Sequence, residues 1–335
     1  MSRFSRPVFA ALAVAVAVAG ACALPAPRVP AAPGVGLPDR IAVRLKGRVT
    51  SVPFEEYVLG SALAEVTPVG ESTAAVSRIY EVQAIIARTY ALAHLGRHRA
   101  DGFDVCDATH CQLYDPARIA TSRFSAVAAD AVRRTAGEVL IYGRRPVDAL
   151  YHADCGGSTS AADAIWGGRP LPYLRGTTDD LPTVTHRTWT FNAGAEALRA
   201  ALNRDPRTAV GARFTGIDIA ARDDGGRATS VTVRGTQDRV VRGEDFRAVL
   251  NRSLGDRAIQ STRFAIRRSG TSYTFEGTGF GHGVGLCQAG AAARARRGDG
   301  LSDILRAYFA DASLAVAGRR TSLSSSGLKR TRGPD

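Results

Sequence analysis

The amino-acid sequence predicts an α+β fold, with helices and antiparallel strands mixed in one large domain. Helical and alternating hydrophobic patterns follow one another without the regular strand–helix alternation of a doubly wound parallel sheet. A middle section, about residues 185–278, is mostly strand-like. With 335 residues, of which 45% are hydrophobic and 22% charged, the chain is long enough to bury a large core.

The first 22 residues have the pattern of a secretory signal. Arg3 and Arg6 precede an apolar run from Val8 to Ala19, and small residues follow it. The run is too short to span a bilayer comfortably. We therefore expect an exported protein with a periplasmic or cell-envelope location. Cys22 stands where a lipid-modified cysteine would follow the cleavage point, so a lipoprotein and a free secreted protein both stay open.

Two further segments near the ends lack the pattern of packed structure. Residues 23–39 are rich in Pro, Ala and Gly, which predicts an extended tether. Residues 319–335 are polar and basic, which predicts a disordered tail. The folded domain is therefore expected to span residues 40–318.

The formal net charge of +13 does not by itself indicate a nucleic-acid-binding protein. Nearly all the basic residues are Arg, a bias that a GC-rich genome also produces. They are scattered and lack the aromatic-interleaved patch of a single-strand binder. We therefore expect no nucleic-acid partner. An exported basic protein could instead meet an anionic polymer or surface, and wall glycans and anionic lipids both qualify.

Hydrophobic spacing predicts the elements of the first part of the domain. In chain order they are a strand at 41–45, a helix at 53–65, a polar loop at 67–77, a helix at 80–95, a compact loop at 101–116 and a helix at 117–136. The helix at 80–95 has the clearest pattern, because apolar residues recur on one face and neither Gly nor Pro interrupts it.

The remaining elements follow from the same reasoning. They are a hairpin with strands at 138–142 and 147–152, a turn at 155–159, a strand-rich region at 185–275 that includes helices at 195–202 and 243–250, and closing helices at 286–297 and 301–309. Between the strand-rich region and the closing helices lies the most glycine-dense segment of the chain, residues 277–285.

This glycine-dense segment presents His282 from a backbone that can turn tightly or approach a ligand closely. No Lys-Ser/Thr pair follows it and no βαβ unit surrounds it, so we expect no nucleotide site. A tight structural turn with a packed histidine is the simpler interpretation of the spacing alone.

Three potential metal ligands, Cys106, His110 and Cys111, lie within six residues. Thiolate and imidazole groups suit Zn²⁺, and a closed site needs a fourth ligand, for which His98 is the nearest candidate. A Cys106–Cys111 disulfide is the alternative in an oxidising compartment, and two free thiols are a third. We favour the metal, because the histidine beside Cys111 has no role in a simple bridge.

Cys155 and Cys287 each lie next to a glycine turn and near a histidine, His152 or His282. A long-range disulfide would join the two loops. A catalytic Cys–His pair is the alternative, but it needs a nucleophile kept reduced outside the cytoplasm and an orienting Asn or Asp. We favour the disulfide.

Five sequence blocks occur in a characteristic order, namely PFEEYVLGSALAE, EVQAIIARTYAL, DVCDATHCQLYDP, YHADCGGST and GTGFGHGVGLCQAGA, the last followed by ILRAYF. Together they resemble the sporulation stage II protein D (SpoIID)/LytB family over roughly residues 40–312. The family commonly has Ser where Cys287 stands and a residue other than Cys at position 155. The simultaneous change supports a Cys155–Cys287 pair.

The resemblance implies a lytic transglycosylase that cuts peptidoglycan glycan strands, preferably strands stripped of stem peptides, and forms 1,6-anhydro ends. It identifies Glu65, which closes the first block, as the catalytic acid. It also implies a structural zinc ion held by Cys106, His110 and Cys111, with His98 as fourth ligand. The alternative is a non-catalytic peptidoglycan-binding protein that enhances a cell-wall amidase, which would then be a partner.

A single carboxyl group suits this chemistry. Ordinary glycosidases need two carboxylates, whereas a lytic transglycosylase can use the sugar's own C6 hydroxyl as nucleophile. One Glu then protonates the leaving oxygen and later accepts the hydroxyl proton, for which an apolar surrounding should raise its pKa. We expect the glycan to contact further residues of these blocks, namely Arg88, Tyr151, His152, His282 and Gln288.

Overall fold

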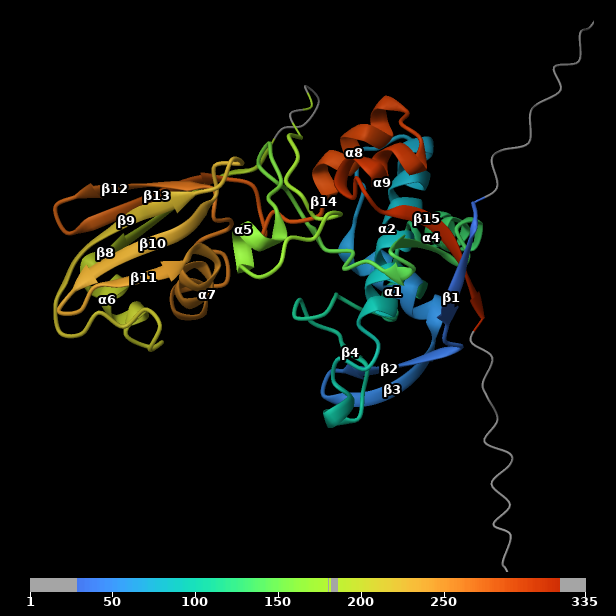
Figure 1. Ribbon diagram of the computed structural model, residues 1–335, viewed down its shortest axis with the longest axis horizontal. Helices are drawn as coiled ribbons and strands as arrows, with labels where there is room; N and C mark the ends of the chain where they lie inside the picture. The colour runs from blue at the N-terminus through green and yellow to red at the C-terminus, as the bar shows by residue number, and fades with distance from the viewer. Residues whose placement is uncertain (1–28, 180, 182–185, 320–335) are drawn as a thin grey trace, which may run out of the picture.

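The computed structural model describes residues 29–179, 181 and 186–319. These residues form a mixed α+β fold, as predicted, with a helical body and a β-rich unit that lie at opposite ends of the long axis (Figure 1). The predicted signal segment 1–22, including Cys22, lies outside the described residues. Among the residues described, none of the helices combines the length and the apolar character needed to cross a bilayer.

The body is built from residues on both sides of the β-rich unit. Its elements before that unit are β1 (Ala31–Leu37), β2 (Arg40–Leu45), β3 (Arg48–Pro53), α1 (Phe54–Glu65), α2 (Thr73–Ala93), a 3₁₀ turn (Arg99–Asp101), β4 (Val105–Cys106), α3 (Ala117–Thr121), α4 (Ser125–Arg134), β5 (Glu138–Tyr142), β6 (Arg145–Pro146), β7 (Tyr151–His152) and α5 (Ala162–Trp166). Its elements after that unit are β14 (Leu286–Cys287), α8 (Gln288–Arg297), α9 (Leu301–Tyr308) and β15 (Ser313–Arg319).

Helix α2 is the centre of the body. It packs against α1, α4, α8 and strand β5, and its apolar residues form much of the largest core cluster. The helix begins at Thr73, within the segment for which a polar loop was expected. The Ser72 side chain accepts a hydrogen bond of 3.3 Å from the Ala75 N–H, which stabilises this earlier start.

A four-stranded sheet joins the two ends of the described chain in the order β1-β15-β5-β6. Strand β1 runs parallel to β15, with Ala31 opposite Val316. The prediction of a tether over residues 23–39 is therefore wrong for residues 31–37. Small residues let this Pro/Ala/Gly-rich segment lie flat beside β15, and Ala32 and Val35 are buried.

The predicted helix over residues 117–136 is instead two helices, α3 and α4. The break occurs at Ser122, whose backbone is extended with φ −76° and ψ 132°. The Ser122 hydroxyl accepts a hydrogen bond of 3.2 Å from the Phe124 N–H, so a local side-chain bond competes with helix continuation.

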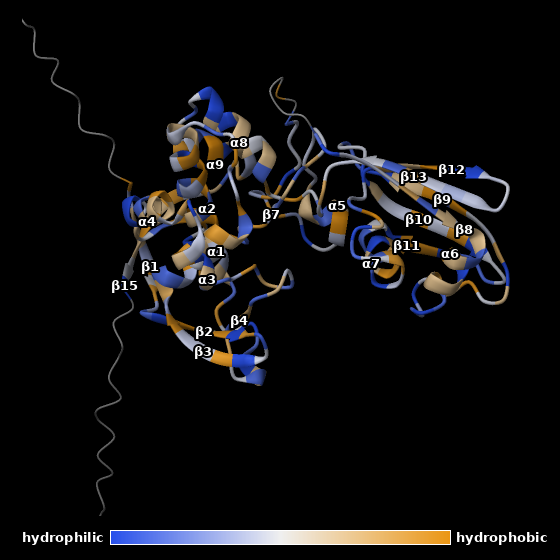
Figure 2. Cartoon of the chain, turned by 180° about the vertical axis from the view of Figure 1, so that it is seen from behind, coloured by the Kyte–Doolittle hydropathy of each residue, from blue (hydrophilic) through white to orange (hydrophobic). Residues whose placement is uncertain are grey.

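The β-rich unit has a core of its own. Its elements are β8 (Thr188–Gly194), α6 (Ala195–Leu202), β9 (Phe214–Arg222), β10 (Ala228–Gly235), β11 (Arg239–Arg242), α7 (Gly243–Leu254), β12 (Phe264–Ser269) and β13 (Ser272–Thr278). The strands form two three-stranded antiparallel sheets, β11-β10-β9 and β12-β13-β8. Its buried aromatic and aliphatic residues form a cluster separate from that of the body, and Figure 2 shows hydrophobic residues along these strands.

The glycine-dense segment returns the chain from the β-rich unit to the body. Gly285 has φ +71°, and a Cβ there would collide with the Leu150 carbonyl oxygen. Gly283 has φ +80°, and a Cβ there would occupy the place of the Arg227 guanidinium. At both positions glycine is needed for the backbone conformation and for close packing.

Candidate active site

Glu65 is the last residue of α1. The helix ends there because Val66 adopts an extended conformation, with φ −127° and ψ 142°. The opposite face of α1, including Tyr57 and Val58, is fully buried in the core. Glu65 is partly buried and lies at the end of a rigid element, which fixes the position of its carboxyl group.

The Glu65 carboxyl group is held by two hydrogen bonds to the same oxygen. Oε1 accepts one of 2.7 Å from the Leu113 N–H and one of 2.6 Å from the Tyr151 hydroxyl. Among the described residues, none makes a hydrogen bond to the other oxygen, Oε2. Oε2 is also not fully buried, so it keeps some exposure to solvent. Oε2 is therefore the oxygen that remains accessible for proton transfer.

Burial raises the pKa of Glu65 above its usual value, and the bonds from Tyr151 and Leu113 partly oppose this effect. The pKa of Tyr151 is raised well above 10 by burial and by the Glu65 charge. Tyr151 therefore keeps its proton and remains a donor. The arrangement favours a carboxyl group that can carry a proton at higher pH than an exposed glutamate, as general acid catalysis requires.

The position of Tyr151 is set by a short parallel pair of strands, β7 and β14. In this pair Leu286 lies opposite Tyr151 and Cys287 lies opposite His152. Successive side chains of a strand point to opposite faces. Tyr151 accordingly reaches Glu65, while His152 is 4% exposed and its Nδ1 lies 3.2 Å from the Val284 carbonyl oxygen.

Two of the residues predicted to bind the glycan, Arg88 and His152, are buried. Arg88 is fully buried and makes a bidentate ion pair with Glu55, at 2.7 and 2.8 Å, and a 3.1 Å hydrogen bond to the Glu138 carbonyl oxygen. Its donors are committed inside the body, so the prediction for Arg88 is wrong. His152 is only 4% exposed, and its Nδ1 lies 3.2 Å from the Val284 carbonyl oxygen, which does not favour direct contact with a glycan.

His282 is linked to the candidate site through Tyr151, and Gln288 lies beside α2. The His282 ring lies 5.2 Å from the Trp166 ring and 5.5 Å from the His152 ring, centroid to centroid. Burial and the Arg227 charge lower the pKa of His282 to about 3, while a hydrogen bond to the Tyr151 backbone partly opposes them. Neutral His282 and Glu65 are thus both linked to Tyr151. Gln288 is partly buried and donates a 3.3 Å hydrogen bond to Gln83 of α2.

The sequence reasoning missed Leu113 and Trp166. Leu113 acts through its backbone N–H, which no residue-type pattern reveals. Trp166 is 36% exposed at the end of α5, beside His282. One of only two tryptophans in the chain, placed before a Gly-Gly pair, was the available signal.

The four predicted metal ligands come together. The ligand atoms of His98, Cys106, His110 and Cys111 all lie within 4.8 Å of one another. Cys111 Sγ is 3.4 Å from His98 Nε2 and 3.7 Å from His110 Nδ1, and Cys106 Sγ is 3.8 Å from His110 Nδ1. Both cysteines are free thiols in this structure.

This donor set fits a tetrahedral zinc ion. Sulfur and nitrogen ligands at ordinary zinc distances lie about 3.3–3.8 Å apart. His98 is also oriented for the role, because its ring stacks on Phe103 at 4.5 Å and its Nδ1 lies 3.7 Å from an Asp101 carboxylate oxygen. This leaves Nε2 directed toward Cys111, as in many metal-binding histidines.

The four-ligand cluster is directly connected to Glu65. Leu113, whose N–H holds Oε1, follows Cys111 by two residues. Between them, Gln112 is buried and donates hydrogen bonds of 2.9 Å to the Tyr57 hydroxyl and 3.3 Å to the Ala87 carbonyl oxygen. Anything that fixes the 98–111 loop therefore also fixes a donor to the carboxyl group.

Cys155 and Cys287 are also brought together, as the disulfide prediction requires. The Cys155 N–H donates to Cys287 Sγ at 3.2 Å. Both are free thiols in this structure, so the predicted bond itself is not formed in it.

Comparison with known proteins finds family models and several relatives that match this chain. Residues 46–142 match the family model described as "Stage II sporulation protein", and residues 182–285 match a domain of unknown function. Stage II sporulation protein D of Bacillus subtilis is 26% identical over 283 residues, which cover 80% of this chain and 76% of the relative.

Two further relatives extend the comparison. An uncharacterised protein of Brachyspira hyodysenteriae is 28% identical over 78% of this chain and 66% of its own length. The amidase enhancer of Bacillus subtilis is 26% identical over 68% of this chain, but only 37% of its own length is covered. The family-model match and these relatives support the predicted resemblance to the SpoIID/LytB family.

Proposed function

We propose that this protein is a lytic transglycosylase that cleaves peptidoglycan glycan strands, preferably strands stripped of stem peptides. The observation that carries the proposal is the Glu65 carboxyl group, with Oε1 held by Tyr151 and Leu113 and Oε2 without a hydrogen bond from any described residue. Its raised pKa suits a group that must first donate a proton and then accept one.

The proposed reaction uses this one carboxyl group twice. Glu65 Oε2 gives its proton to the glycosidic oxygen as the bond from that oxygen to C1 of the sugar breaks. The C6 hydroxyl oxygen of the same sugar then bonds to C1, and its proton returns to Glu65. The products are a free hydroxyl on the leaving strand and a 1,6-anhydro end, with Glu65 restored to its protonated form.

Trp166 and His282 are the side chains that we assign to glycan binding. An exposed indole can pack against the apolar face of a sugar ring, and the neutral imidazole beside it can hydrogen-bond to a sugar hydroxyl. Gln288, partly buried at the start of α8, remains a third candidate.

We assign a zinc ion to His98, Cys106, His110 and Cys111. A closed four-ligand site of this kind supplies structural stability rather than an open coordination position. The ligands hold the loop whose next residues, Gln112 and Leu113, are tied to the core and to Glu65.

The family also suggests a second function, a non-catalytic peptidoglycan-binding protein that enhances a cell-wall amidase. It is favoured by the match to the Bacillus subtilis amidase enhancer. In either case we propose export to the cell envelope, with Cys22 as candidate lipid anchor, and a cell-wall amidase as candidate partner.

Product analysis separates the two functions. Purified protein is incubated with peptide-free glycan strands, and soluble fragments are examined by mass spectrometry. Cleavage should yield fragments with 1,6-anhydro ends, and Glu65→Gln should abolish them while circular dichroism shows a retained fold. Binding to insoluble wall without release of fragments, combined with stimulation of an added amidase, would favour the enhancer instead.

A further inference from the structure

Cys155 and Cys287 lie at the junction where the β-rich unit joins the body. Cys155 follows β7, before the chain enters that unit, and Cys287 ends β14, directly after the chain returns. The two residues are 132 positions apart. They enclose all of β8 to β13 and the whole of the matched segment 182–285.

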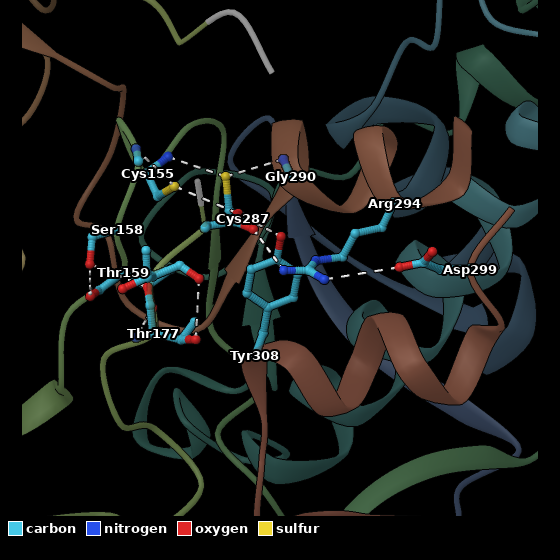
Figure 3. Close-up of polar contacts among 12 residues, drawn as sticks. Cys155, Ser158, Thr159, Thr177, Cys287, Gly290, Arg294, Asp299 and Tyr308 are labelled. Carbon is cyan, nitrogen blue, oxygen red and sulfur yellow. Dashed lines mark hydrogen bonds and ion pairs between the residues drawn. The ribbon is translucent and has the colours of Figure 1, made fainter. Parts of the chain in front are cut away.

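The two thiols are adjacent and enclosed. Their Sγ atoms lie within 4.8 Å of each other, and both residues are 0% exposed. Cys287 Sγ accepts hydrogen bonds from the Cys155 N–H at 3.2 Å and the Gly290 N–H at 3.3 Å, as Figure 3 shows. These bonds fix Cys287 beside Cys155.

A buried carboxylate beside the thiols, that of Asp179, already has partners. Asp179 is fully buried, and one of its oxygens lies 3.7 Å from Cys155 Sγ. Its carboxylate accepts a 2.7 Å hydrogen bond from the Tyr308 hydroxyl and pairs with Arg294 at 3.0 Å. Asp179 is therefore satisfied without the thiols, and converting both into an uncharged bond leaves no buried charge unpaired.

We propose that Cys155 and Cys287 form a disulfide bond that closes the base of the β-rich unit. Each thiol loses one proton and one electron, and the two sulfur atoms bond. The oxidant is the disulfide of an extracytoplasmic thiol–disulfide oxidoreductase, which is reduced to its dithiol. The sulfurs, which lie within 4.8 Å of each other, must approach to about 2.05 Å to form the bond.

The bond would hold two parts of the molecule. It would cross-link the two chain segments that connect the β-rich unit to the body, so that the unit becomes a closed loop. It would also fasten β14 beside β7, the strand that carries Tyr151 to Glu65. The inference concerns the bond itself and does not require the proposed enzymatic function.

The alternative to a disulfide is a metal ion bound by the two cysteines together with His152. The ligand atoms of His152, Cys155 and Cys287 also lie within 4.8 Å of one another, and the buried His152 Nε2 has no hydrogen-bond partner among the residues that the structure describes. A metal ion bound there would keep both sulfurs as thiolates and would exclude the disulfide.

Peptide mapping under non-reducing conditions tests the proposal. The full chain is isolated from the medium or periplasm of an exporting host, alkylated in denaturant without reductant, and digested. We expect one peptide pair linked through Cys155 and Cys287, which disappears after reduction. Recovery of both cysteines in alkylated form would overturn the proposal. So would a zinc ion that is retained in Cys106→Ser/Cys111→Ser but lost in Cys155→Ser.

Thermal unfolding gives an independent readout. Dithiothreitol should lower the melting temperature of the wild-type protein by about 10 °C, because a loop of this length is released. The matched Cys155→Ser/Cys287→Ser variant should already melt at the lower temperature and should not respond to dithiothreitol. Equal responses of the two proteins would contradict the bond. Neither readout uses glycan cleavage, so failure here and failure of the proposed function are distinguishable.

Discussion

Replacing Tyr151 by Phe removes one hydroxyl group and leaves the ring in place. That hydroxyl donates the 2.6 Å hydrogen bond to Glu65 Oε1, the shorter of the two bonds that hold the carboxyl group. Because the pKa of Tyr151 is raised well above 10, the wild-type hydroxyl is a donor over the whole working pH range. Its loss therefore affects the ionised form of Glu65 more than the protonated form.

A hydrogen bond to a charged group contributes about 1.5–3 kcal/mol. Removing it disfavours the Glu65 carboxylate relative to the carboxylic acid by about 10- to 150-fold. The alkaline limb of the pH–rate profile should consequently move to higher pH. The maximal rate should fall by about tenfold, because the carboxyl group keeps only the Leu113 N–H to orient it.

The assay is the release of 1,6-anhydro fragments measured across pH, with Tyr114→Phe as matched control. The Tyr114 hydroxyl is buried and has no hydrogen-bond partner within the described part of the chain, so its removal should leave the pH–rate profile in place. If Tyr151→Phe lowered the rate without moving the alkaline limb, Tyr151 would be a packing residue and the account of the Glu65 pKa would be refuted.

Three further predictions follow from the same contacts. The pKa of Glu65 is raised in the folded state because burial disfavours the ionised carboxylate. The protonated side chain therefore contributes its full stability below about pH 4.5, and this contribution is lost as the pH rises through the folded-state pKa. Glu65→Gln should therefore raise the free energy of unfolding by about 1 kcal/mol at pH 7 and have little effect near pH 4 in urea titrations. Arg88→Ala should lower it by about 3 kcal/mol, since the ion pair with Glu55 is lost, while glycan affinity of the folded protein stays unchanged. Removing zinc with a chelator, or Cys106→Ser, should lower activity at least about tenfold and expose the 98–113 loop to protease; a metal-free protein with full activity would contradict the zinc assignment.

Periodicity predicted most elements of the body and both helices of the β-rich unit. It missed β1, because small residues and prolines in a strand look like a linker until β15 is known to lie beside them. It missed the break at Ser122, where a single side-chain hydrogen bond competes with helix propensity. The composition of a segment does not show whether such a side-chain hydrogen bond will form, so the break could not be predicted from it.

The candidate site was predicted in part. The blocks that resemble the family contain Glu65, Tyr151 and the four clustered metal ligands, and the structure brings each set together. Arg88 was misassigned, because the sequence alone does not show whether an arginine is buried in an ion pair with a glutamate or faces a ligand. The Leu113 N–H could not be predicted, since every residue except proline carries one and only the fold directs it.

The separate core of the β-rich unit was also beyond the sequence reasoning. A run of strands shows that a region is β-rich, but it does not show whether its apolar faces pack on the body or on one another. In the structure they pack on one another, in a cluster separate from that of the body.

The most direct test of the account is the end group released from peptide-free glycan by wild-type protein and by Glu65→Gln. If Glu65 supplies the proton, wild-type protein releases 1,6-anhydro ends, and the variant releases them at least about 100-fold more slowly with its fold intact. Equal release by both proteins would show that another group carries the chemistry.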